Sequence, residues 1–99
     1  MLAQYKGWYV MKLKYELTIM NMGDEYAAVP VGDDAAKFHG MLKLNEESAD
    51  ILEQLKEDTD PYKIHKYLKK KHPEATDDEI GQMLVDFLNK LVREGLLIL

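Results

Sequence analysis

Apolar and polar residues alternate along residues 11–20, where charged residues or threonine separate the apolar positions. This period of two is typical of a strand with one buried and one exposed face. Residues 21–24 (Asn-Met-Gly-Asp) suit a tight turn, so we expect residues 25–31 to return as the second strand of a hairpin. Pro30 cannot donate a ladder hydrogen bond, which predicts that it lies at a strand end or on an edge.

The alternation returns in residues 38–44 and then changes to the spacing of a helix. Residues 38–44 are therefore the predicted third strand of a meander. From Asn45 onward the apolar residues lie three to four positions apart, which is typical of an amphipathic helix. Asn45 suits the N-cap, and Glu46 and Glu47 suit the positive end of the helix dipole, so the sequence predicts a helix to about residue 57.

Two further helices are expected in the second half of the chain. Asp60, followed by a proline, predicts the start of one helix. Thr76 and Glu79 have the spacing of a capping box, which predicts a last helix over residues 77–94 with Gly95 just beyond its end. Three strands followed by three helices make the predicted fold class α+β.

A chain of 99 residues is about one small domain. The strand pattern starts at residue 11, so we assign residues 11–99 to the domain and residues 1–10 to an N-terminal extension. Two interpretations of the extension remain open at this stage. Either it contributes little to the fold, or Trp8 and Tyr9 pack against the domain as an arm.

Composition indicates a folded protein of the cell interior. Hydrophobic residues make up 46% of the chain and charged residues 31%, which is ordinary for a globular domain. Cysteine is absent, so disulfides and thiolate chemistry are excluded. Lysines and a glutamate interrupt the apolar N-terminus, so no run approaches the roughly 18 uncharged residues of a spanning helix. We therefore expect a cytoplasmic protein without a membrane partner.

Charge is distributed unevenly along the chain. The net charge of −5 argues against binding to nucleic acid, which depends on clustered lysine and arginine. Residues 61–73 nevertheless carry five lysines and no acid, between two acidic neighbours. In a helix-turn-helix protein the second helix should be the basic one, whereas the last helix here begins with acidic residues. A solvated helix face and an acidic protein partner remain the two interpretations of the lysines.

Catalytic and metal-binding motifs are absent from the sequence. His39, His65 and His72 do not have metal-ligand spacing, and Gly32-Asp33-Asp34 lacks the regular spacing of a calcium loop. Gly-rich phosphate loops, nucleophile elbows and paired carboxylates are also missing. We therefore expect no enzyme activity, no cofactor and no metal.

The last predicted helix is apolar over more than half of its circumference, which is wider than a surface helix needs. The extra width has two interpretations. It packs against the strands or the C-terminal Leu-Leu-Ile-Leu, or one flank with Met83, Phe87 and the Lys90 stem lines a groove for a partner. A groove needs a second wall, and an edge strand at residues 38–44 supplies it by accepting an extended peptide. Gly40 then allows close approach, although a bend explains it equally well.

The motifs around these segments resemble the PqqD-like family, which belongs to the RiPP recognition elements. The order of elements matches the family, as do the junction Leu-Lys-Leu-Asn-Glu-Glu-Ser-Ala-Asp-Ile-Leu and the ending Asp-Phe-Leu-Asn-Lys-Leu-Val-Arg-Glu-Gly-Leu-Leu. The matching positions are Leu44, Asn45, Ala49, Ile51, Leu52, Phe87, Leu88, Leu91, Gly95 and Leu96. The resemblance covers residues 11–99 and depends on the order and spacing of degenerate motifs.

The resemblance implies a truncated winged-helix domain that binds the leader of a ribosomally made precursor peptide. In such domains the leader adds beside the third strand, lies against the last helix and is presented to a modifying enzyme, often a radical SAM enzyme. Transferred to this chain, the implied contacts are Gly40, Met41, Leu42, Lys43, Met83, Phe87 and Lys90. A winged-helix regulator and a subunit that dimerises through the wide apolar helix remain as alternatives.

Overall fold

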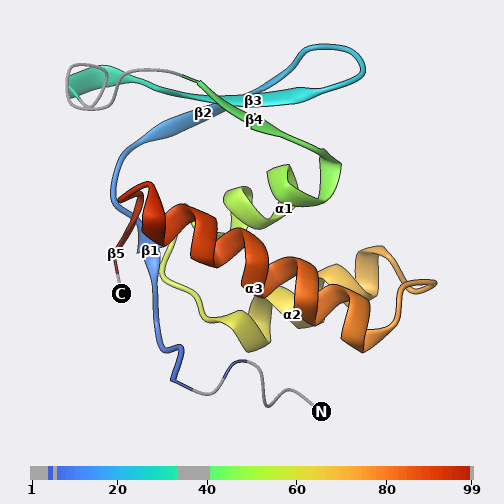
Figure 1. The fold of residues 1–99 in the computed structure, drawn as a ribbon. Helices are drawn as coiled ribbons and strands as arrows, with labels where there is room; N and C mark the ends of the chain where they lie inside the picture. Colours follow the sequence, from blue (N-terminus) through green and yellow to red (C-terminus); the bar gives the residue numbers. More distant parts are fainter. Residues whose placement is uncertain (1–4, 6, 34–40, 99) are drawn as a thin grey trace.

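The computed structural model describes Tyr5, residues 7–33 and residues 41–98. The strands are β1 (Lys12–Leu13), β2 (Leu17–Asn21), β3 (Tyr26–Pro30), β4 (Leu42–Leu44) and β5 (Leu97–Ile98), and the helices are α1 (Glu46–Gln54), α2 (Pro61–Lys71) and α3 (Asp77–Arg93). Strands β2, β3 and β4 form an antiparallel sheet in that order, and the helices form a second layer on one side of it (Figure 1). The predicted α+β class is confirmed.

The first predicted strand is divided in two, so its prediction as one strand was wrong. β1 pairs with β5 near the C-terminus, whereas β2 pairs with β3. At the end of β1 the N–H of Leu13 donates to the carbonyl of Leu55 at 2.9 Å, and just after it the N–H of Lys14 donates to the carbonyl of Leu96 at 2.8 Å. The alternation of buried and exposed residues continues across the bend, from Leu13 to Leu17. The sequence pattern therefore could not reveal the change of partner.

The sheet has one face toward the core and one face away from the helices. The register pairs Ala28 with Leu42 and Tyr26 with Leu44, and both leucines are buried. Residues 38–40 of the predicted third strand lie outside the described residues, and β4 begins at Leu42. Pro30 ends β3, as predicted.

The predicted helix starts are confirmed. Asn45, Asp60 and Thr76 cap α1, α2 and α3, each accepting a backbone N–H through its side chain. α1 ends at Gln54 rather than near residue 57, because the chain turns away to form a two-way backbone bridge between Thr59 and Met11. α3 ends at Arg93, and Gly95 follows with a φ of 72°, a left-handed conformation that favours glycine.

The core lies between the sheet and the helices and includes a residue from the N-terminal segment. Ile51, Leu52, Leu68, Leu84 and Leu88 are fully buried at its centre. Tyr5 is fully buried as well, and Trp8 packs against the cluster while Tyr9 stays exposed. The segment before residue 11 thus contributes core surface through Tyr5, a residue that the sequence analysis did not single out.

Candidate functional site

The outer edge of β4 is the first part of the candidate site. Among the described residues β4 pairs with β3 alone, so its other side has no strand beside it. Successive residues of an antiparallel strand direct their N–H and C=O groups to opposite sides, so part of the β4 backbone is available to an added strand. β4 leads through Asn45 directly into α1 (Figure 1).

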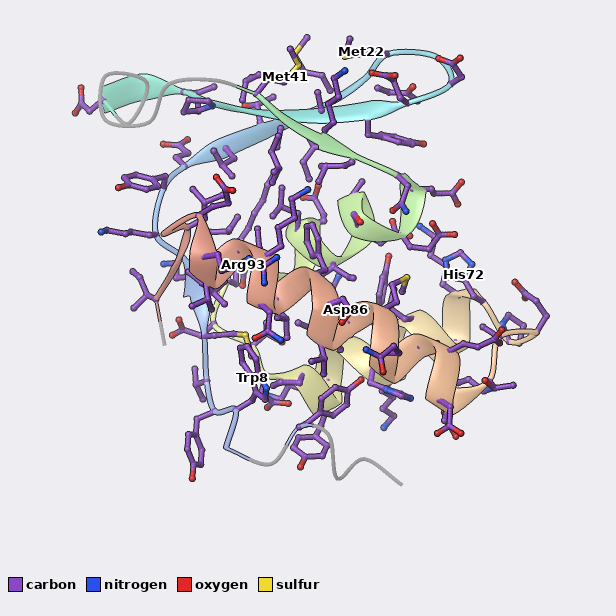
Figure 2. The ribbon with its side chains drawn as sticks, viewed as in Figure 1. Trp8, Met22, Met41, His72, Asp86 and Arg93 are labelled. Carbon is purple, nitrogen blue, oxygen red and sulfur yellow. The ribbon has the colours of Figure 1, made fainter. Side chains whose placement is uncertain are left out.

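The side chains at β4 divide between the two faces of the sheet. Leu42 is buried at 8% exposure, so it belongs to the core. Lys43 and Met41 are exposed, and Met41 lies with Met22 on the side of the sheet remote from the helices (Figure 2). Gly40 lies outside the described residues. An added peptide would therefore contact Leu42 through its backbone and Met41 or Lys43 through their side chains.

The three predicted contacts on α3 differ in exposure. Met83 is half-buried, Lys90 is exposed, and Phe87 belongs to the core with 8% of its surface exposed. The helix positions them by its spacing, since residues three and four apart share one face. Met83 is therefore the apolar residue among the three with side-chain surface left for a ligand.

A hollow of about 360 Å³ lies beside Met83. We call it the Met83 hollow. Its floor is apolar, and three glutamates contribute to its lining. It is lined by Glu47, Leu68, His72, Glu74, Ala75, Glu79, Ile80 and Met83. Because Glu47 lies in the first turn of α1, directly after β4, the hollow lies close to the end of the free strand edge.

The carboxylates give the Met83 hollow a negative rim. The Thr76 N–H donates to Glu79 at 2.8 Å and lowers the pKa of that carboxyl, which keeps it ionised. The side chain of Glu74 is 77% exposed. An apolar floor with a negative rim suits an apolar side chain that has a basic neighbour.

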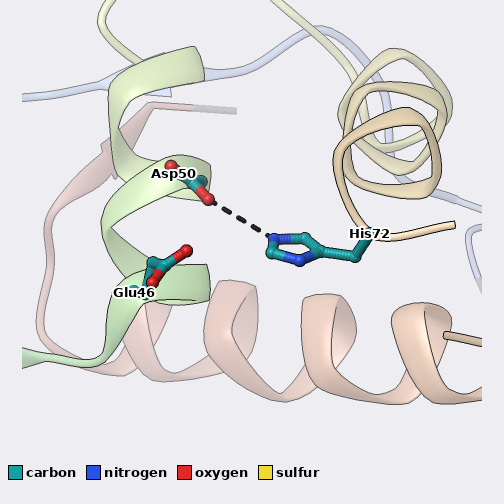
Figure 3. A group of neighbouring side chains, drawn as sticks. All are labelled: Glu46, Asp50 and His72. Atoms are coloured by element: carbon teal, nitrogen blue, oxygen red, sulfur yellow. Dashed lines mark ion pairs between the residues drawn. The ribbon is translucent and has the colours of Figure 1, made fainter. Parts of the chain in front are cut away.

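Glu46, Asp50 and His72 form a cluster that shares His72 with this hollow (Figure 3). Each offers a ligand atom within 4.8 Å of the others, and His72 Nε2 lies 3.6 Å from Asp50 Oδ2. Lys71 Nζ donates to Asp50 Oδ1 at 2.7 Å, and this bond raises the pKa of Lys71. Lys71 takes only Oδ1 of Asp50, and in the described part of the chain Asp50 Oδ2 and His72 Nε2 are buried without a hydrogen-bond partner. The ammonium group repels a cation at this place, and its ion pair with Asp50 links α1 to the end of α2. Sequence spacing could not predict the cluster, because His72 is far from the two acids along the chain.

A second network joins the N-terminal segment to α2 and α3. The Tyr5 hydroxyl donates to His65 Nδ1 at 2.6 Å, and His65 Nε2 donates to Asp77 Oδ1 at 3.0 Å, an assignment that satisfies all three groups. Burial raises the pKa of Tyr5, and the bond from His65 lowers the pKa of Asp77. His65 is buried, and both of its ring nitrogens have partners.

Within the described ranges, no helix is long and apolar enough to cross a membrane. Neither the curated proteins nor the solved structures contain a match to this chain. The family model described as coenzyme PQQ synthesis protein D (PqqD) does match, over residues 18–97. That match spans the sheet except for Leu17, the three helices and both parts of the candidate site. The chain therefore belongs to the PqqD family, the RiPP recognition elements, whose members are non-catalytic peptide-binding accessory proteins.

Proposed function

We propose that this protein is a peptide chaperone that binds the leader of a ribosomally made precursor peptide. The leader adds as a strand to the outer edge of β4 and continues against α3 at the Met83 hollow. The protein makes no bond itself and needs no cofactor. It presents the leader to a modifying enzyme, which we infer to be a radical SAM enzyme, in the cytoplasm where the precursor is made.

The observation that supports this proposal is the outer edge of β4, together with an apolar hollow that is bordered by Glu47 in the helix directly after β4. Strand addition needs unpaired backbone groups, and among the described residues nothing pairs with the outer edge of β4. Specificity needs a nearby place for side chains, and Met83 and Ile80 offer an apolar one. Membership in the PqqD family supports a peptide as the ligand.

The test is an amide NMR titration of the labelled protein with the leader half of a short open reading frame encoded beside its gene. We expect shifts at residues 41–44 and on one flank of residues 83–90. Shifts confined to α2 on addition of duplex DNA, with none from the leader, would instead favour a winged-helix regulator. Sedimentation of the free and bound protein distinguishes a monomer from a homodimer.

Substitution of Met83 tests the hollow separately from the strand edge. We expect Met83→Asp to weaken leader binding about tenfold, because partial loss of methionine burial is worth roughly 1.4 kcal/mol. Val92→Asp is the matched control, since Val92 lies on α3 but is 42% exposed and outside the hollow. Circular dichroism verifies that both variants fold. Equal affinity of the two variants would remove the hollow from the binding site.

A further inference from the structure

The lysines of α2 fall into two groups according to their partners. Lys69 Nζ donates to the carbonyl of Ala75 at 2.5 Å and closes the loop before α3, and Lys71 is paired with Asp50. For the amines of Lys63, Lys66 and Lys70, the described part of the chain contains no ion pair or hydrogen bond. Internal contacts thus explain Lys69 and Lys71 and leave three lysines unexplained.

These three lysines lie on one face of α2. Their spacing is i, i+3 and i+7, which brings their side chains into a single stripe along a helix. All three are exposed, and α2 contains no acidic residue that could neutralise them. The stripe therefore concentrates positive charge on a protein whose net charge is −5.

A second hollow of about 650 Å³ borders this stripe. We call it the Tyr62 hollow. Its walls include Tyr62 and several lysines of α2, and the buried His65 contributes to its lining. It is lined by Tyr62, His65, Lys66, Lys69, Lys70 and Asp77. Tyr62 is 46% exposed and is supported by an edge-on contact with the buried ring of Tyr5, whose centroid lies 5.4 Å away.

We propose that the exposed face of α2 is a second docking surface, separate from the Met83 hollow. It binds an acidic segment of a partner protein that carries an aromatic or large apolar side chain. The carboxylates of that segment pair with Lys63, Lys66 and Lys70, and the apolar side chain enters the Tyr62 hollow. This inference does not depend on leader binding at β4.

Charge complementarity favours an acidic protein segment over nucleic acid. Affinity for a phosphate backbone grows with the number of phosphates neutralised, and three unpaired lysines neutralise few. Asp77 also lies at the hollow, where its carboxylate would repel a continuous line of phosphates. A protein segment can place its acids beside the lysines and its apolar side chain away from Asp77.

The test uses the full chain and an acetylated peptide with one tryptophan between glutamates. We expect amide shifts at Tyr62, Lys66 and Lys70 at low salt. We expect Lys66→Glu/Lys70→Glu to bind the peptide about tenfold more weakly or worse, because two attractive charges become repulsive. Lys12→Glu/Lys14→Glu is the matched control, with the same change in net charge on β1 and the bend after it, and it should change affinity less than about threefold.

Three further probes decide the outcome. A peptide with glutamine in place of each glutamate should bind much more weakly than the original peptide. A peptide with alanine in place of tryptophan should also bind less tightly than the original. A single-stranded oligonucleotide should bind more weakly than the acidic peptide. Equal loss in the control variant, equal binding of the glutamine peptide or tighter binding of the oligonucleotide would overturn the proposal. Thermal unfolding of each variant ensures that only folded protein is compared.

Discussion

The Met83 hollow and the Tyr62 hollow are similar in construction and opposite in charge. Both lie against α2 and α3, and both have apolar walls. Glutamates surround the first, whereas lysines surround the second. Hydrophobic surface alone would allow either hollow to accept the same apolar side chain. The charged rims distinguish the two hollows. Glutamates repel an acidic segment from the first hollow, and lysines repel a basic segment from the second.

The two hollows also differ in the secondary structure beside them. The Met83 hollow is bordered by Glu47, directly after β4, so the proposed leader would combine strand addition with side-chain contacts. The Tyr62 hollow lies against a helix whose backbone hydrogen bonds are already used, so its ligand depends on side chains. We therefore expect an extended peptide at the first hollow and a salt-sensitive contact at the second.

Loss of the Leu68 side chain should have the largest effect, because it removes core contacts of α2, one of the two helices that border both hollows. Leu68 is fully buried on α2 and forms part of the Met83 hollow. We expect Leu68→Ala to lower the free energy of unfolding by about 2–5 kcal/mol, a large fraction of the stability of a small domain. Urea denaturation measures this change. Lys63→Ala on the same helix is the control and should cost less than about 0.5 kcal/mol.

The next largest effect is that substitutions at each hollow should weaken only the peptide that binds there. Met83→Asp should weaken the leader about tenfold and leave the acidic tryptophan peptide unchanged. Lys66→Glu/Lys70→Glu should do the reverse, unless the leader itself is acidic. Fluorescence anisotropy with labelled peptides measures both affinities for both variants. If either variant weakened both peptides equally, the two hollows would not be independent sites.

Removal of the N-cap of α3 should lower the stability of the whole domain by a smaller amount. Both hollows depend on this helix. Glu79 N–H donates to Thr76 Oγ1 at 3.1 Å, and Thr76 N–H donates to Glu79, which completes a capping box. We expect Thr76→Ala to destabilise the protein by about 1 kcal/mol, measured as a lower urea midpoint with an unchanged slope. Thr76→Ser retains the hydroxyl and should restore most of the stability. A full effect in the serine variant would mean that the cap is not responsible.

The cap was predictable because it is local. Thr76 and Glu79 are three residues apart, and Asn45, Asp60 and Gly95 likewise act within one helical turn. The divided first strand was not predictable, since the partner of β1 is at the other end of the chain. Periodicity reports which face of a segment is buried, but it does not identify the segment that pairs with it.

The candidate site shows the same limit. The sequence indicated an edge strand and a broad apolar helix, and the structure has Leu42 and Phe87 buried while Met83 lines a hollow. The glutamate rim of that hollow comes from α1 and from residues 74–79, two segments far apart in the sequence, so no local motif could predict it. Tyr5 and His65 are 60 residues apart, and their bond could not be predicted from spacing.

The smallest predicted effect concerns Asp77, which belongs to this network and lies at the Tyr62 hollow. The bond from His65 lowers the pKa of Asp77 below its ordinary value of 3.8. A lowered carboxyl pKa contributes stability above the unfolded-state pKa, and this contribution disappears as the pH falls through the folded-state pKa.

Asp77→Asn should therefore be less stable than the wild type near neutral pH, and the difference should shrink below about pH 4. Urea denaturation at several pH values measures it. Asp78→Asn removes a charge from the same helical turn, where the helix dipole acts similarly, but leaves the His65 bond intact. If Asp78→Asn gave an equal pH dependence, the helix dipole rather than His65 would be responsible.

Asp77→Asn should also increase the affinity for the acidic peptide by less than about twofold, since an exposed charge is screened.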